Sequence, residues 1–341
     1  MSIITMESMT RQDAVNYYND GMELLNNIAA EEQQAKVGIL LATILRRNFV
    51  FVGPAGDGKS TLAQDAWRLV EEAHEPNAVV HLSGQHDTKA THIIGGEMTM
   101  HSNKSDGTSE SNTVVVDGQV SPDLVWLDFD EFNLSDPDAV QSVNKALEAR
   151  ALNIGGKNVP LDRLVTVGLT MNPTGRRGNG FEVSGRAGSR VSIGVLVGDD
   201  LSLARAVRLE KTRAVRDFKS NTTRTPLEDL KPVITLSNLQ GLRKLTLATK
   251  VVPEIGRLID ELTVDSVDVL AKHNIIEGTG RLNGQILENA QGLAIMTKTD
   301  GMVAEKEVRD AARYVLTGRF GMLSKKNTDD IQSIIEEAVA A

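Results

Sequence analysis

One stretch decides the fold of this chain, and it reads Phe49-Val50-Phe51-Val52-Gly53-Pro54-Ala55-Gly56-Asp57-Gly58-Lys59-Ser60-Thr61. A short apolar run enters a glycine-rich turn, which ends in Gly-Lys-Ser. This is the full G-x-x-x-x-G-K-[ST] pattern, set between a predicted strand and a predicted helix. The glycines let the backbone fold around an anion, and the amides then point at it from the positive end of the helix. We therefore predict that residues 53–61 bind nucleotide phosphates, with Lys59 on the outer phosphates and Ser60 on Mg²⁺.

The overall composition excludes several classes of protein. The 341 residues include 37 basic and 46 acidic side chains, for a net charge of −9, and no cysteine. Non-specific binding to nucleic acid needs concentrated Lys and Arg, and disulfides or zinc–thiolate sites need cysteine. The longest apolar run near the start, residues 37–45, is too short to span a bilayer, and no signal peptide is apparent. We therefore expect a cytoplasmic protein without membrane insertion.

The order of the predicted elements indicates an α/β fold followed by a helical region. Strands are predicted at residues 49–52, 78–82, 124–127, 164–169 and 191–197. Because these strands alternate with helices, they favour a parallel sheet with crossover helices. Further helices are predicted at residues 59–73, 138–150, 201–219, 236–250, 254–274, 281–297, 305–318 and 329–340.

Two domains are predicted from this layout. Residues 1–199 should form an α/β nucleotide-binding domain with two N-terminal helices, and residues 200–341 an all-helical lid domain. The polar region 84–120 is predicted to be an insertion, largely irregular, with a hairpin arm at 113–116 and a mobile tip near 102–112. A second hairpin is expected at 154–160.

Acidic and amide side chains follow two of the predicted strands. Asp130 and Glu131 come at the end of an apolar run, where α/β sheets place ligand groups. One carboxylate can bind Mg²⁺ and its neighbour can polarise an attacking water, although Asp128 in the same run leaves the register open and a solvated strand end is the alternative. Asn172, after the next strand, can hold the water by hydrogen bonds, but Asn-Pro is also a common turn dipeptide.

Three arginines are candidates for neutralising phosphate charge. Arg186 and Arg190 precede the last predicted strand, from which an arginine could reach into the site of a neighbouring subunit. Arg281 opens a helix after a Gly-Thr-Gly segment and could approach the phosphates of its own subunit when the lid closes. Solvated surface arginines explain the same positions, and spacing alone favours that interpretation for Arg281.

These motifs, in this order, resemble the MoxR group of the AAA+ ATPases over roughly residues 28–320. Asp130-Glu131-Phe132-Asn133 is similar to the magnesium motif of the family. Other matching segments are Ile93–Glu97, Gly118–Val120, Pro160-Leu161, Val165–Pro173, Ser184–Val191, Gly278–Arg281 and Val303–Arg319. The sequence departs from the family pattern at Ser189-Arg190-Val191, where the family has Asp-Arg-Phe, and at Met171, where it has Gln.

The resemblance implies a P-loop AAA+ core and a ring, usually a hexamer, with ATP and Mg²⁺ bound between subunits. It aligns Arg190 with the arginine finger and Arg281 with the sensor 2 arginine. It also implies chaperone-like remodelling or activation of a protein client or a metal-cofactor enzyme, often with a von Willebrand factor A-domain partner.

Two other functions stay open on the sequence. A nucleic-acid motor of the restriction or helicase-loader type would have one evident basic stripe, in the predicted helix at 201–219, but a charged helix is usually a solvated face. A nucleotide-gated switch that hydrolyses poorly is the other, although Glu131 and Asn172 argue against it.

Overall fold

The structure is a computed structural model of the chain. It describes residues 9–29, 32–53, 58–85, 90, 93, 95–103, 109–116, 118–135, 137–154, 157–172, 189–197, 229–298, 300–323 and 328–340. Several predictions fall outside these ranges, namely those for Pro54–Asp57, Arg186, the 155–156 turn, the 201–219 helix and the boundary at 199–200.

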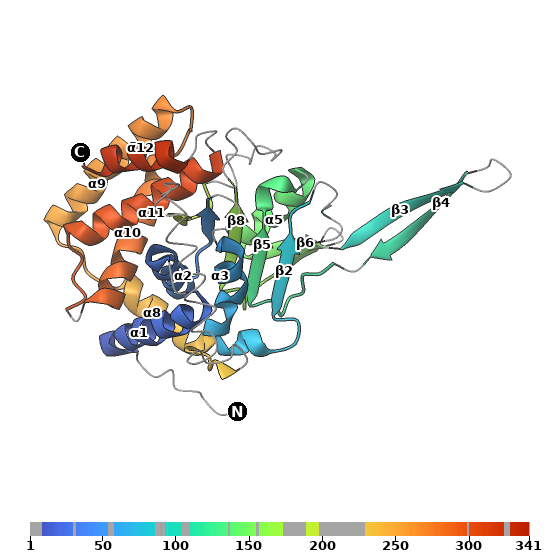
Figure 1. The fold of residues 1–341 in the computed structure, drawn as a ribbon, viewed down its shortest axis with the longest axis horizontal. Coiled ribbons are helices and arrows are strands. Elements are labelled where there is room, and N and C mark those ends of the chain that lie inside the picture. Colours follow the sequence, from blue (N-terminus) through green and yellow to red (C-terminus); the bar gives the residue numbers. More distant parts are fainter. Residues whose placement is uncertain are drawn as a thin grey trace, which may run out of the picture.

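The central element is a five-stranded sheet in which every strand pair is parallel. Its strand order is β2-β5-β8-β1-β9, and helices lie on both of its faces (Figure 1). The strands are β1 (Phe49–Val52), β2 (Val79–Ser83), β5 (Trp126–Asp130), β8 (Thr166–Met171) and β9 (Ile193–Leu196). All four residues of β1 are buried, as expected for a strand covered on both faces. The predicted α/β fold is confirmed.

The strand boundaries differ from the prediction at β5 and β8. The sequence pattern placed these strands at 124–127 and 164–169, whereas pairing begins two residues later in each. Leu124, Val125, Leu164 and Val165 are buried but precede the paired segments. Apolar residues report burial, which extends beyond the paired strand segments. As a result, Asp128 and Asp130 lie inside β5, and Glu131 directly follows it.

Helices make up most of the remainder (Figure 1). They are α1 (Arg11–Ile28), α2 (Gln33–Leu45), α3 (Lys59–Asp65), α5 (Pro137–Ala149), α8 (Leu236–Leu247), α9 (Pro253–Lys272), α10 (Thr279–Thr297), α11 (Glu305–Leu323) and α12 (Thr328–Ala340). The single helix predicted at 59–73 is wrong, because α3 ends at Asp65 and two 3₁₀ turns follow it. Val70 separates those turns in an extended conformation and bridges to Ile234. This distant contact overrides the local helical pattern.

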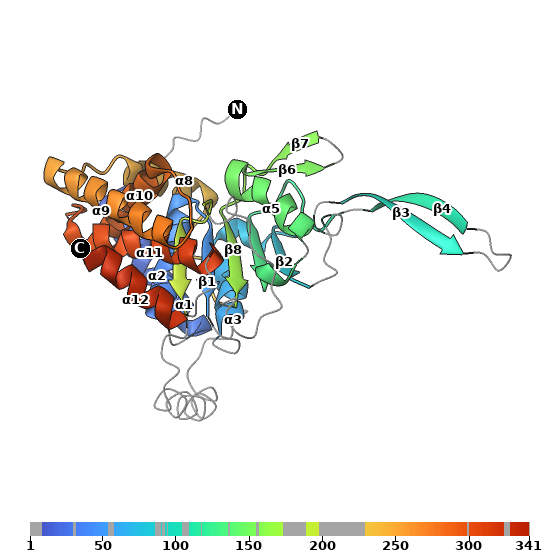
Figure 2. The ribbon, with the colours of Figure 1, turned by 90° about the horizontal axis from the view of Figure 1, so that it is seen from above.

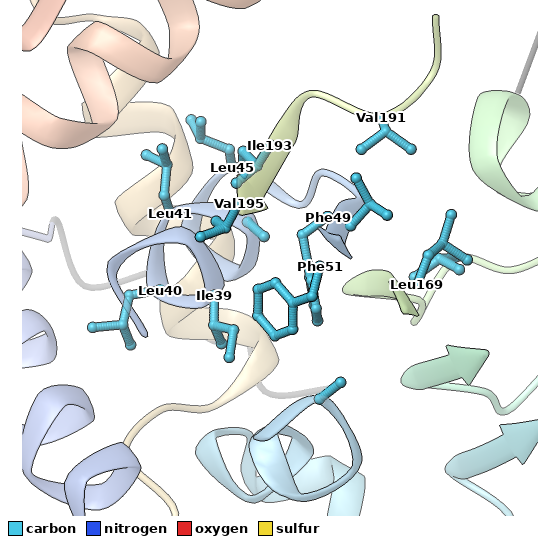
Figure 3. Packing of buried hydrophobic residues seen from close by; sticks show 14 of the residues in the cluster. Ile39, Leu40, Leu41, Leu45, Phe49, Phe51, Leu169, Val191, Ile193 and Val195 are labelled. Atoms are coloured by element: carbon cyan, nitrogen blue, oxygen red, sulfur yellow. The ribbon is translucent and has the colours of Figure 1, made fainter. Parts of the chain in front are cut away.

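The C-terminal helices pack directly against the β9 edge of the sheet. Figure 3 shows side chains of α2, including Ile39 and Leu41, beside residues of β1 and β9. α11 approaches β9 so closely that a Cβ added to Gly194 would lie 2.0 Å from the backbone nitrogen of Gly318. Buried hydrophobic residues of α2, the sheet, α10 and α11 form one continuous cluster.

Arg319 is a fully buried charge at this junction. Its Nε donates to Glu277 Oε2 at 2.6 Å, and the guanidinium also donates to the backbone oxygens of Val191 and Ser189 and to Gln285 Oε1. Burial lowers the pKa of Arg319, and the adjacent Glu277 opposes that shift. A buried arginine needs such a full set of partners, so this network ties α11 to the segment that precedes β9.

Two antiparallel hairpins leave the sheet region. β3 (Gly96–Asn103) and β4 (Ser109–Val116) pair along their whole length, and the hairpin projects far from the body (Figures 1 and 2). The irregular conformation predicted at 102–112 is therefore wrong for residues 102–103 and 109–112. Its polar composition misled the prediction, because a projecting ladder is held by backbone hydrogen bonds and needs no apolar alternation. β6 (Ala151–Ile154) and β7 (Lys157–Pro160) form the second, predicted hairpin.

Within the described ranges, no helix combines the length and the apolar composition needed to cross a bilayer.

Candidate active site

The carboxyl ends of β1, β5 and β8 bring together residues from three distant segments. Gly53 follows β1, and a Cβ at this position would lie 1.9 Å from the carbonyl oxygen of Val197. Gly58 caps α3 with a φ of 77°, in the left-handed region that favours glycine. The backbone therefore requires glycine at both of these positions. Lys59 takes the first position of α3.

Lys59 folds back toward Gly53, the residue that follows β1. Its side chain is buried, with 6% of the residue exposed. Nζ donates to the carbonyl oxygen of Gly53 at 2.8 Å and to Asn172 Oδ1 at 3.3 Å. The ammonium group therefore lies between Gly53 and Asn172, at the carboxyl ends of β1 and β8, where bound phosphates would meet it.

Ser60 and Asp130 form a pair of hard oxygen ligands. Ser60 Oγ donates to Asp130 Oδ1 at 2.6 Å, and Thr170 Oγ1 donates to the same oxygen. Hydroxyl and carboxylate oxygens are the ligands that Mg²⁺ prefers, so this donor set fits that ion. Thr170, which sequence reasoning missed, also accepts a hydrogen bond from the backbone N–H of Glu131 at 3.0 Å. Its signal was its place in β8, the strand that directly precedes Asn172.

Glu131 adopts an uncommon backbone conformation beside Asn172. Its φ of 50° lies in the left-handed region, which costs a non-glycine residue about 1–2 kcal/mol. Asn172 Nδ2 lies 3.4 Å from Glu131 Oε1, and Asn133 Nδ2 donates to the carbonyl oxygen of Asn172 at 3.1 Å. The strained turn directs this carboxylate to the group expected to hold a water, and strain of this kind is frequent at active sites.

Asp128 lies deeper in β5 and does not contact Ser60. It is fully buried, and its Oδ2 lies 3.6 Å from His81 Nδ1 on β2. Burial raises the pKa of Asp128 to about 6. The register that the sequence left open is thereby decided by β5, which places Asp130 against the loop serine.

Substitutions at these two aspartates should therefore differ in effect. We expect Asp130→Asn to lower ATP turnover by at least about 100-fold, since metal ligation is worth several kcal/mol in the transition state. Asp128→Asn should keep turnover within the same order of magnitude. Steady-state phosphate release at saturating Mg²⁺ checks both, with circular dichroism to confirm folding. A reversed ranking would show that the register is misassigned.

Arg190 and Arg281 lie at the opposite end of the sheet, where the parallel strands begin. We call this end the amino edge, and the end where the strands finish the carboxyl edge. Arg190 precedes β9 and forms an ion pair with Glu148 of α5, while Arg281 Nη1 donates to Ser189 Oγ at 2.7 Å. Both line a cavity of about 520 Å³ beside the residues that enter β1. In this structure Arg281 therefore lies away from Lys59 of its own chain, whereas lid closure was predicted to bring Arg281 to the phosphates there. The reason is that α10 packs against the segment before β9.

Comparisons with known proteins agree with this geometry. Residues 48–190 match the family described as AAA domain (dynein-related subfamily). The fold is similar to the solved structure of a proposed ATPase from Cytophaga hutchinsonii ATCC 33406, with a TM-score of 0.66, 15% sequence identity and 96% of each chain covered. At this identity the likeness concerns the fold. No curated protein matches the sequence significantly.

The phosphate loop, the parallel sheet and the family match define the class of this protein. Residues 48–190 form an AAA+ P-loop domain, and the protein is an ATP-hydrolysing enzyme.

Proposed function

We propose that this enzyme is a Mg²⁺-dependent ATPase of the MoxR type that acts as a ring, of six subunits by analogy with the MoxR group. One observation supports the ring. The predicted nucleotide-binding residues lie at the carboxyl ends of the strands, and Arg190 and Arg281 lie at the amino ends. In a head-to-tail arrangement, each subunit presents its amino edge to the loop of the next. Such heterologous contacts close into rings when the rotation permits.

Each residue of the carboxyl edge has a role in this proposal. Lys59 exchanges its bond to the Gly53 carbonyl for the outer phosphates. Ser60 and Asp130 hold Mg²⁺, which when bound neutralises charge on the phosphates. Glu131 orients the attacking water and accepts its proton, while Asn172 holds both the water and the Glu131 carboxylate.

The two arginines then act on the phosphates of the neighbouring subunit. Arg190 is held by Glu148, and a neighbouring triphosphate would compete for the same guanidinium. Arg281 lies on the exposed first turn of α10, beside Ser189, so it belongs with Arg190 in this role and not with its own phosphate loop. Charge from such arginines stabilises the transition state of phosphoryl transfer.

The work driven by hydrolysis is proposed to be remodelling or activation of a protein client or metal-cofactor enzyme. The support is the resemblance to the MoxR group, which also suggests a partner with a von Willebrand factor A domain. The β3–β4 hairpin is the element that projects furthest from the body, which makes it a candidate for contact with a client (Figure 2).

Mixing subunits tests the shared site. Arg190→Ala subunits should lose about 10³-fold in turnover on their own, and they should depress wild-type activity more than in proportion to their fraction. Arg257→Ala, which changes an exposed arginine on α9, is the matched control. Mixing these subunits with wild-type subunits should leave the ATPase activity unchanged. Light scattering with ATP and Mg²⁺ reports assembly. A strictly proportional decline, or a protein that stays monomeric, would refute the ring.

A further inference from the structure

The cavity at the amino edge of the sheet holds more positive charge than the described residues neutralise. Six arginines and three carboxylates line it. Two of those carboxylates are already engaged, because Glu288 forms a bidentate ion pair with Arg47 and Glu148 pairs with Arg190. A chain with a net charge of −9 nevertheless concentrates arginine here.

Three further arginines in this cavity, Arg46, Arg150 and Arg243, form no ion pair with a carboxylate within the described part of the chain. Arg46 donates to the carbonyl oxygens of Asp162 and Leu164, and Arg150 donates to that of Arg46. Carbonyl oxygens satisfy N–H groups without neutralising charge. The third lining carboxylate, Asp162, partly offsets the effect of burial on the pKa of Arg46, and Glu288 does the same for Arg243.

Buried donors remain unused in this trio. Nη1 of Arg150 and Nε of Arg243 are buried and have no hydrogen-bond partner among the described residues. Burial, followed by repulsion from Arg46, Arg47 and Arg243, lowers the pKa of Arg150 to about 9. Burial and a neighbouring arginine also lower the pKa of Arg46 and of Arg243. Unpaired buried donors and mutual repulsion both cost free energy at this cavity, and a bound anion would relieve both.

The chemistry of the lining selects the kind of anion. Each strongly basic group here is a guanidinium, whose planar fork matches the oxygens of phosphate and binds them in pairs. The volume of about 520 Å³ lies within the range of roughly 300–1,000 Å³ that is usual for small-molecule sites. A chain of linked phosphates, with several oxyanions, suits several guanidinium groups better than a single carboxylate does.

We propose that Arg46, Arg150 and Arg243 form a binding site for a polyphosphate group at the amino edge of the sheet. The site is separate from the phosphate loop, because residues 46–48 enter β1 and the loop leaves it. The polyphosphate can come from free solution or from a triphosphate presented by a neighbouring subunit. For free polyphosphate the inference does not depend on the ring, whereas for a neighbour's triphosphate it rests on the proposed function, and the two sources are distinguished by experiment.

The first experiment measures the binding of a free polyphosphate to a protein whose phosphate loop is disabled. Sodium tripolyphosphate is titrated by calorimetry into Lys59→Ala protein, held dilute and shown to be monomeric by light scattering. We expect one site, weakened at least tenfold when Arg150→Gln is added. Arg243→Gln provides the same test should Arg150→Gln fail to fold, and Arg257→Gln is the matched control that should bind normally.

The second arm measures ATP-driven assembly of protein with an intact loop. If tripolyphosphate does not bind the monomer, Arg150→Gln and Arg243→Gln should each raise at least tenfold the ATP concentration needed for assembly, which assigns the site to a neighbour's triphosphate. If both variants match Arg257→Gln in both arms, the proposal is overturned. A protein that never assembles but binds tripolyphosphate through Arg150 would refute the ring and leave this site standing.

Discussion

Replacing Glu131 with glutamine is expected to leave ATP binding intact and to slow turnover by about 10²–10⁴-fold. Glutamine keeps the size of the side chain and its contact with Asn172, but it cannot accept a proton from water. Single-turnover phosphate release and nucleotide titration separate the two effects. Glu75→Gln, at the exposed pair with Arg163, is the matched control and should turn over normally.

Normal hydrolysis by Glu131→Gln would show that the acidic pair has been misassigned. If the assignment holds, the variant also serves as a trap, since ATP-bound assemblies should persist together with whatever they hold. A pull-down with this variant therefore tests the proposed client role. Recovery of nucleic acid in place of protein would favour the motor function that the sequence left open.

Replacing Lys59 with alanine is expected to weaken ATP binding by at least about 100-fold, equivalent to about 3 kcal/mol, since hydrogen bonds to charged groups contribute about 1.5–3 kcal/mol each. The ammonium group lies between Gly53 and Asn172, and no other side chain on α3 carries a positive charge. Calorimetry with ATP and Mg²⁺ measures the loss. Lys272→Ala, on the exposed face of α9, should bind as the unmodified protein does.

Circular dichroism and urea unfolding should accompany this variant, because Lys59 is buried and also satisfies the Gly53 carbonyl. A Lys59→Ala protein that folds and keeps its ATP affinity would place the nucleotide somewhere other than residues 53–61.

The sequence predicted features whose chemistry lies in consecutive residues. Gly53, Gly58 and Lys59 are specified by the steric needs of one turn, and the structure shows those needs as a 1.9 Å clash and a positive φ. Asp130 and Glu131 were predicted from a strand end, but an apolar run does not reveal where pairing stops. For that reason the choice between Asp128 and Asp130 needed the position of β5.

Features that join distant segments were not predictable in this way. Val70 ends a helical pattern because it meets Ile234, more than 160 residues away in the sequence. Arg319 gave no sign of being buried, since the Glu277 and backbone partners that permit its burial come from other elements. The basic cavity draws its arginines from five separate stretches, none of which is unusual on its own.

By itself, therefore, the sequence determined the class of fold, the phosphate loop and the groups at the carboxyl edge of the sheet. Only the tertiary structure decided which acid meets the loop serine, and that Arg281 lies with Arg190 at the far edge. The physical reason is that turn geometry and strand-end chemistry act over a few residues, whereas the meeting of distant side chains is set by how the apolar faces of α2, α10, α11 and β9 are buried together.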